Sequence, residues 1–128
     1  MFTIDYKSRL PIYRQLVNRV EQLAARGILA PGSQLPSVRA LAVELSINPN
    51  TIAKAYSELE ARGVVYSITG KGSFIADNTD SLRKETLARL NKKMSRLAEE
   101  IYYLGLEKND FLEICEQSWK KAATKESE

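Results

Sequence analysis

Apolar residues at helical spacing open the chain and predict a first helix from Leu10 to Arg26. They recur every three or four positions, as on one buried helix face, at Ile12, Leu16, Val20 and Leu23. Gly27 follows where helices often end on a left-handed residue. The chain therefore begins with one amphipathic helix and a defined stop.

Two shorter helices follow, separated by the tight turn Ser46-Ile47. The first spans Val38 to Leu45, and Ser37 is its expected N-cap. The second spans Pro49 to Arg62, with Asn48 as its N-cap and a proline at its first position, where the missing N–H loses no hydrogen bond. Its inward stripe consists of Ile52, Ala55, Tyr56 and Leu59.

Two β-rich runs, Val64–Ile68 and Ser73–Ile75, are joined by Thr69-Gly70-Lys71-Gly72, which is a hairpin signal. The polar stretch Asp77–Asp80 is expected to be a linker. A hairpin after two helices and a tight turn indicates a winged helix-turn-helix, a shape that places one helix in the major groove of DNA.

A heptad pattern follows the linker. Six apolar residues recur at alternating steps of three and four, as at the a and d positions of a coiled coil: Leu87, Leu90, Met94, Leu97, Ile101 and Leu104. The pattern is shorter than the roughly three to four heptads of a free coiled coil. We therefore expect this helix to pack against another helix or another subunit, and these six residues are the predicted dimer contacts.

Gly105 separates this helix from a second one, expected over about Asn109 to Lys121, and the tail beyond it is expected to fray. Tyr102, Tyr103 and Trp119 are expected to pack between the two helices, which can hardly enclose the roughly 300 Å³ of a small-molecule site. The predicted fold is mainly α with a small β-hairpin wing. It comprises a winged helix-turn-helix DNA-binding domain over residues 1–78 and a short helical dimerisation or effector domain over residues 79–128.

The composition argues against an enzyme. The chain of 128 residues has one cysteine, Cys115, and no histidine, so it forms no intrachain disulfide and lacks the ligands of a Cys/His metal site. No Ser-His or Cys-His nucleophile can be assembled. We expect no catalytic residues, no metal and no cofactor. Because no apolar run approaches the roughly 20 residues that span a bilayer and no signal peptide is evident, we expect a cytoplasmic chain without a membrane partner.

The positive charge is concentrated in the first part of the chain. Residues 1–78 carry nine Lys and Arg against six Asp and Glu, whereas residues 79–128 carry ten of each. The whole net charge of +3 therefore lies with the helix-turn-helix pattern, as phosphate contacts require.

Two helix starts supply candidate DNA contacts. Arg39 follows an N-cap by two residues and is suited to a phosphate or a guanine edge; the alternative is an ion pair with Glu44 or solvent exposure. Asn50, Thr51 and Lys54 share the outward face of the next helix. Their side chains suit adenine, a thymine methyl or phosphate, and guanine or phosphate; the alternative is an ordinary polar helix face.

The wing tip Gly70-Lys71-Gly72 supplies a third candidate. Its glycines let the backbone approach a groove wall, and Lys71 adds a charge. The alternative is a tight hairpin with no further role.

Residues from Pro11 to Ile75 resemble the GntR family of bacterial transcription regulators. The resemblance is carried by PIYRQL, GILAPGSQLPSVRALA, NTIAKAYSELEARG and GKGSFI at fixed spacings. The Asn-Pro-Asn-Thr helix start and the short C-terminal helix pair resemble the YtrA-like subfamily. This resemblance implies a winged helix-turn-helix that dimerises through its C-terminal helices and usually represses an operon, often one encoding an ABC transporter.

Transferred by position, the family's DNA contacts fall on Arg39, on Asn48 to Thr51 and on the wing. With the neighbouring helix starts, the predicted DNA-binding set is Ser37, Arg39, Asn48, Asn50, Thr51, Lys54, Gly70, Lys71 and Gly72. Many family members have arginine where this chain has Pro49 and Ala53, so no operator sequence is transferred. The aminotransferase-like domain of one branch is missing, which argues against a pyridoxal cofactor, and no effector is identified.

The sequence thus predicts a homodimeric DNA-binding regulator, a repressor that binds an inverted-repeat operator in double-stranded DNA, rather than an enzyme. The alternative is a winged-helix module for protein–protein contact. That alternative predicts no salt-dependent DNA binding and no need for Arg39 or Lys71.

Overall fold

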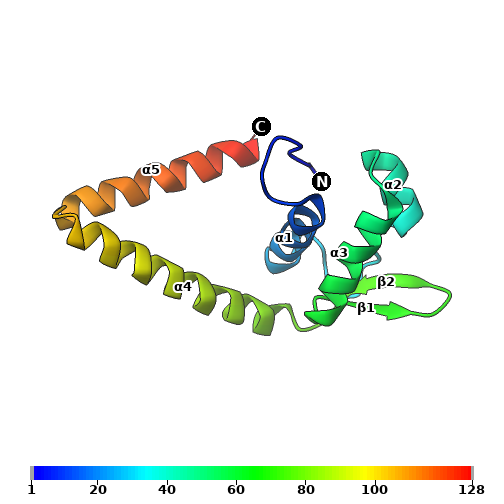
Figure 1. The fold of residues 1–128 in the computed structure, drawn as a ribbon. Helices are drawn as coiled ribbons and strands as arrows, with labels where there is room; N and C mark the ends of the chain where they lie inside the picture. The colour runs from blue at the N-terminus through cyan, green and yellow to red at the C-terminus, as the bar shows by residue number, and fades with distance from the viewer. Residues whose placement is uncertain (1, 128) are drawn as a thin grey trace. The chain divides into compact units, whose positions relative to one another are not determined.

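The computed structural model describes residues 2–127, apart from the side chains of Thr79, Glu126 and Ser127. It divides into two compact units, one ending at Lys84 and the other beginning at Glu85 (Figure 1). The described elements are α1 (Ile12–Ala25), α2 (Val38–Leu45), α3 (Pro49–Ala61), β1 (Val65–Ile68), β2 (Gly72–Ile75), α4 (Thr79–Tyr103) and α5 (Lys108–Ser127). The prediction of a mainly α fold with a small hairpin wing is confirmed.

Local hydrogen bonds fix the ends of the first three helices. The Ser37 hydroxyl accepts a bond from the Ala40 N–H at 3.0 Å, and the Asn48 side-chain oxygen accepts one from the Asn50 N–H at 2.8 Å. Gly27 ends α1 with a φ of +75°. The predicted caps and stop are therefore present, because each depends on residues that are close in sequence.

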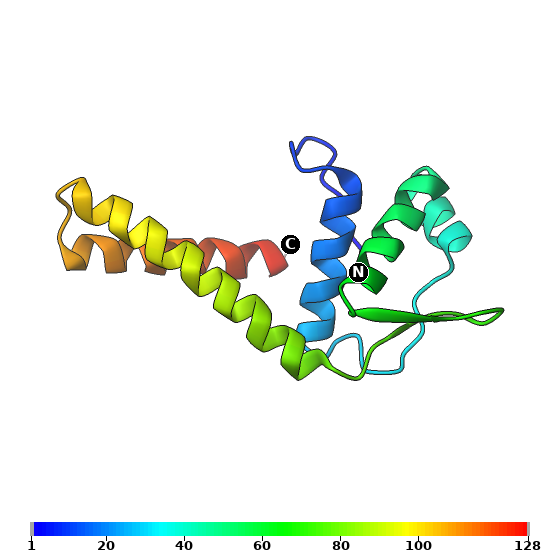
Figure 2. The ribbon, with the colours of Figure 1, turned by 60° about the horizontal axis from the view of Figure 1, so that its bottom comes forward.

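The core of the first unit lies between α1, α3 and the hairpin, and α1 runs beside α3 (Figure 2). The inner stripe of α3 is buried, as predicted, at Ile52, Ala55, Tyr56 and Leu59. Leu16, Val17 and Val20 of α1 are buried in the same cluster. Because α3 uses this face for the core, its opposite face stays on the surface.

A third backbone segment pairs with the hairpin, which the sequence patterns did not reveal. β1 and β2 pair antiparallel with Val65 opposite Ile75. On the other side of β2, the Leu35 N–H donates to the Ser73 carbonyl and the Ile75 N–H donates to the Ser33 carbonyl, both at 2.8 Å. The segment before α2 therefore holds the base of the wing.

Two predictions for the second half of the chain are wrong. The linker expected at Asp77–Asp80 is shorter, because α4 begins at Thr79 and the Asn78 carbonyl accepts the Leu82 N–H at 3.1 Å. Leu82 packs against the first unit's core, which favours helix from this point. The tail does not fray before Ser127, since the residues after Lys121 are compatible with helix and continue α5.

The helices α4 and α5 of the second unit diverge from the turn at Gly105 (Figure 1). Trp119, expected between them, is 78% exposed, and Tyr102 and Tyr103 are exposed as well. The prediction that these rings pack between the two helices is therefore wrong for a single chain. No described helix is both long and apolar enough to cross a membrane. The domain division at 78/79 stays a prediction.

Candidate nucleic-acid interface

The N-terminal end of α3 presents polar side chains away from the core. Asn50 and Lys54 are exposed and Thr51 is half-buried. The Asn48 side chain is engaged as the helix cap, so it is less available for a base than Asn50. Among the described residues, no hydrogen bond occupies the side-chain amide of Asn50. Asn50, Thr51 and Lys54 are thus placed as predicted, and their contacts with DNA stay a prediction.

Lys54 lies over an aromatic ring of α1. Its ammonium group is 3.9 Å from the centroid of the Tyr13 ring, and the Arg14 guanidinium lies 5.2 Å from the same centroid. The electron-rich ring face attracts a cation at such distances. Tyr13 therefore holds Lys54 on the outer surface of α3, a role that the sequence patterns missed.

A second set of contacts joins α1 to the far end of α3. Arg62 binds Glu21 of α1 at 2.6 Å and Glu58 of α3 at 3.1 Å, and Arg14 lies 3.9 Å from Glu58. The hydrogen bond with Glu21 is the main cause of a raised pKa of Arg62. These partly exposed pairs orient α3 on α1 more than they stabilise the fold.

The N-terminal end of α2 presents Arg39 to solvent. No ion pair between Arg39 and Glu44 forms among the described residues, so that part of the alternative finds no support, whereas a solvent-exposed Arg39 agrees with its other part, and a DNA contact of Arg39 stays a prediction. Ser37 accepts a hydrogen bond as the cap, and its own O–H can still donate to a phosphate. Both side chains are accessible at the start of α2.

Tyr56 connects α3 to the entrance of α2. Its hydroxyl donates to the Pro36 carbonyl at 2.6 Å. Burial, assisted by the nearby charge of Glu44, raises the pKa of Tyr56 to about 12. This bond ties α3 to the segment that leads into α2 and Arg39.

The wing tip depends on glycine at two positions. Gly70 and Gly72 have φ values of +80° and +122°, which side-chain-bearing residues rarely adopt. A Cβ at Gly72 would lie 2.8 Å from the Gln34 side-chain nitrogen. That nitrogen donates to the Lys71 carbonyl at 2.7 Å. Gln34, which the sequence patterns missed, therefore holds the tip with Lys71 exposed.

Together, α2 and the hairpin tip lie on the side of α3 away from α1 (Figures 1 and 2). The cations Arg39, Lys54 and Lys71 come from three separate elements of this unit, and none has an ion-pair partner among the described residues. The arrangement suits a long anionic ligand rather than a small one. No described group of His, Cys, Asp and Glu could hold a metal ion.

Comparison with known proteins decides the family. The profile described as "Bacterial regulatory proteins, gntR family" matches residues 12–75. The HTH-type transcriptional repressor YtrA of Bacillus subtilis (strain 168) is 37% identical over 108 residues, which cover 84% of this chain and 83% of YtrA. The chain belongs to the GntR family. It is a DNA-binding transcriptional regulator, and the resemblance stated from its sequence is confirmed.

Solved structures of GntR-type regulators share this architecture. A transcriptional regulator from Oenococcus oeni superposes with a TM-score of 0.74 at 37% identity and covers 93% of this chain and 99% of its own. The DNA-binding domain of AraR, in complex with operator ORR3, superposes with a TM-score of 0.51 at 27% identity over 58% of this chain and 89% of its own. The second structure is of a protein bound to its operator through this domain.

In this GntR-family chain, the heptad residues of α4 are largely uncovered. Leu87, Leu90, Met94 and Leu97 are each about half exposed, and Ile101 is half-buried. Leu104, which directly follows the last residue of α4, is more exposed. The described residues of one chain therefore leave an apolar seam along α4 in contact with solvent.

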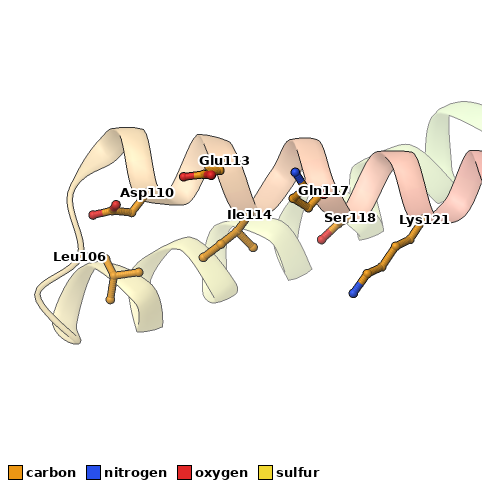
Figure 3. A pocket seen from close by; sticks show the side chains of 7 residues that line it. All are labelled: Leu106, Asp110, Glu113, Ile114, Gln117, Ser118 and Lys121. Carbon is orange, nitrogen blue, oxygen red and sulfur yellow. The ribbon is translucent and has the colours of Figure 1, made fainter.

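One face of α5 borders an open concavity of about 650 Å³ (Figure 3). Its lining is mixed, with Leu106 and Ile114 beside charged and amide side chains at Asp110, Glu113, Gln117, Ser118 and Lys121. No predicted site residue lies in it. It contributes nothing to the DNA-binding set.

Proposed function

We propose that this regulator is a repressor that binds an inverted-repeat operator as a homodimer, and that it acts in the cytoplasm. The observation that supports it most is the set of exposed cations without carboxylate partners on three elements around the recognition helix, Arg39, Lys54 and Lys71. A protein–protein module would have no need to keep these charges unpaired. The likeness to the YtrA repressor over most of both chains also supports repression.

Each element has its own part in this proposal. The N-terminal end of α3 enters the major groove, where Asn50 and Lys54 reach base edges. Arg39 at the start of α2 binds a guanine edge or a phosphate, and the exposed Lys71 of the wing binds a phosphate. Phosphate contacts position the protein and base contacts select the sequence.

The proposed dimer forms through the seam on α4. Leu90, Met94 and Leu97 are about half exposed in one chain, and a contiguous apolar row of this kind favours a covering surface. A second copy with two-fold symmetry presents the same row to the first. The two recognition helices then face half-sites whose centres are near one helical turn, about 34 Å, apart.

The proposed function requires neither catalysis nor a cofactor. The proposed target of regulation is an operon that encodes an ABC transporter, as the family resemblance implies. The proposal names no effector. Repression follows if the dimer occupies a site that polymerase needs.

Selection of bound fragments from genomic DNA tests the proposal. The purified full chain is expected to enrich fragments that share an inverted repeat, and its affinity for them is expected to fall steeply with salt because bound phosphates release counterions. Arg39→Ala is expected to weaken binding, whereas Lys108→Ala, which removes an exposed charge from α5, is the matched control. Equal affinity for all duplexes, or no salt dependence, would favour the protein–protein module.

A further inference from the structure

The segment before α1 is an ordered loop, Phe2–Leu10, that contacts the helix-turn-helix from outside. Phe2 and Ile4 pack against the core. The Gln15 side chain of α1 holds the loop at both ends: it accepts the Asp5 N–H at 2.8 Å and donates to the carbonyls of Asp5 and Leu10, each at 2.9 Å. The loop is therefore fixed to α1 at three backbone groups.

A further bond places this loop beside the helix-turn-helix turn. The Tyr6 hydroxyl donates to the Leu45 carbonyl at 3.0 Å. Leu45 is the last residue of α2, and the recognition helix α3 begins four residues later at Pro49. The loop continues into α1, where the Tyr13 ring lies under the Lys54 ammonium group. The Tyr6 bond thus sets the loop beside the turn that leads into α3, and the contact of Tyr13 with Lys54 joins the helix that follows the loop to α3.

The loop exposes two cations at this place. Lys7 and Arg9 are exposed, and neither has an ion-pair partner among the described residues. The acidic residue of the loop is Asp5. Its side chain accepts a bond from the Lys7 backbone N–H at 3.0 Å, so its carboxylate is engaged with the loop backbone. Because the N-terminal end of a recognition helix enters the major groove, we expect cations beside the turn before it to lie near the phosphates of the groove edge.

We propose that the Phe2–Leu10 loop is an additional DNA-contacting element in which Lys7 and Arg9 bind backbone phosphates beside the recognition helix. The inference rests on the proposed DNA-binding function and extends it beyond α2, α3 and the wing. These contacts add affinity without sequence preference, since phosphates carry no base information. Tyr6 acts as a positioning residue, because it ties the loop to α2 without reaching the DNA.

The double variant Lys7→Gln and Arg9→Gln tests this role, because glutamine keeps length and polarity and removes only the charge. The dependence of log affinity on log salt is expected to become shallower by about two, one for each phosphate that is no longer neutralised. The decrease in affinity is expected to be equal on operator and scrambled duplexes. Lys7→Arg with Arg9→Lys is expected to keep the wild-type slope, and Lys108→Gln with Lys125→Gln on α5 is the charge-matched control.

The outcomes separate this proposal from the proposed function. A steep wild-type slope that the double glutamine variant leaves unchanged overturns the role of the loop alone. A decrease in affinity confined to the operator duplex also overturns it, because that result indicates base reading. A flat wild-type slope contradicts DNA binding itself. The double glutamine variant is expected to unfold at the same temperature as the wild type, because both side chains lie in solvent. This measurement confirms that the variant is folded.

Tyr6→Phe provides a second measurement that keeps every charge. It removes only the hydroxyl bond to the Leu45 carbonyl. If the loop must be held in place, this variant is expected to have a slope between those of the wild type and the double glutamine variant. A wild-type slope for Tyr6→Phe, with a reduced slope for the double variant, would overturn the positioning role of Tyr6.

Discussion

The Lys54 ammonium group of the recognition helix lies 3.9 Å from the centroid of the Tyr13 ring of α1. A long, flexible lysine side chain on a helix surface otherwise samples many rotamers, and fixing them on binding costs free energy. The ring restricts Lys54 before DNA arrives. A residue of the scaffold helix thereby affects a side chain that we propose contacts the DNA.

Replacing Tyr13 with leucine is therefore expected to weaken operator binding by about 0.5–1 kcal/mol, within the usual cost of immobilising one flexible side chain on binding. Tyr13→Phe keeps the ring and is expected to bind like the wild type. In a Lys54→Met background the Tyr13→Leu change should have no further effect on affinity. Titration of labelled operator with the wild type, Tyr13→Leu, Lys54→Met and the double variant measures the coupling between the two residues. Additive effects of the two substitutions would contradict it.

Arg39→Ala is expected to weaken operator binding by about 1–3 kcal/mol if the guanidinium contacts a base edge. Preference at one base pair should then relax. The folded state should keep its stability, because Arg39 is exposed and outside the core. Competition binding with operators mutated one position at a time tests this, and an equal decrease on every duplex would show a phosphate contact instead.

Gly72→Ala is expected to destabilise the chain by about 1–3 kcal/mol, because alanine is strained at a φ of +122°. The new Cβ also displaces the Gln34 amide from the Lys71 carbonyl. Gln34→Ala alone is expected to cost about 1 kcal/mol or less, the contribution of an exposed hydrogen bond. Because Gly72→Ala already breaks that bond, the double variant should be no less stable than Gly72→Ala. Chemical unfolding of the three variants measures these differences, and additive destabilisation would show that the bond survives in Gly72→Ala.

Tyr56→Phe is expected to cost about 1 kcal/mol at neutral pH, through loss of the bond to the Pro36 carbonyl. The pH dependence gives a second test. Burial raises the pKa of Tyr56 to about 12, whereas an unfolded tyrosine titrates near 10. The stabilisation linked to the protonated hydroxyl is thus complete below about pH 10 and is lost as the pH rises towards 12.

Tyr56→Phe should therefore lose less stability than the wild type between pH 10 and 12. Tyr102→Phe, which alters an exposed ring, is the control and should follow the wild type. Urea unfolding at several alkaline pH values compares the three proteins. Parallel curves for Tyr56→Phe and the wild type would contradict a raised pKa.

Leu97→Glu is expected to produce monomers, because a dimer would bury an unpaired carboxylate at a cost of about 3 kcal/mol or more. Operator affinity should fall with it, since one half-site alone lacks the second set of contacts. Ser95→Glu places the same charge on α4 outside the heptad positions and should leave the dimer intact. Sedimentation and operator titration report the two effects, and a Leu97→Glu dimer would mean that the subunits meet elsewhere.

The sequence was informative wherever structure depends on near neighbours. The caps at Ser37 and Asn48 and the buried stripe of α3 could be predicted because residue type and spacing determine them. The bonds from Tyr6 to Leu45 and from Gln34 to Lys71 could not, because the partners are 39 and 37 residues apart. They form only after α1, α2 and the hairpin have packed, and no periodicity marks them.

The second half of the chain shows the same limit in another form. The polar run at Asp77–Asp80 is compatible with a linker and with a helix start. Packing of Leu82 on the core favours the helix. The rings at Tyr102, Tyr103 and Trp119 are apolar enough to suggest burial. Within one chain the divergence of α4 and α5 leaves them exposed, a geometry that residue types do not encode.

The buried face and the exposed face of α3 consist of different residues, and this separation affects how such a regulator can evolve. Ile52, Ala55 and Leu59 are fully buried in the core, whereas Asn50 and Lys54 on the opposite face are exposed. If the exposed residues contact bases as proposed, mutations there change the preferred DNA sequence with little effect on folding. A duplicated gene can thus drift to a new operator while its product stays folded throughout.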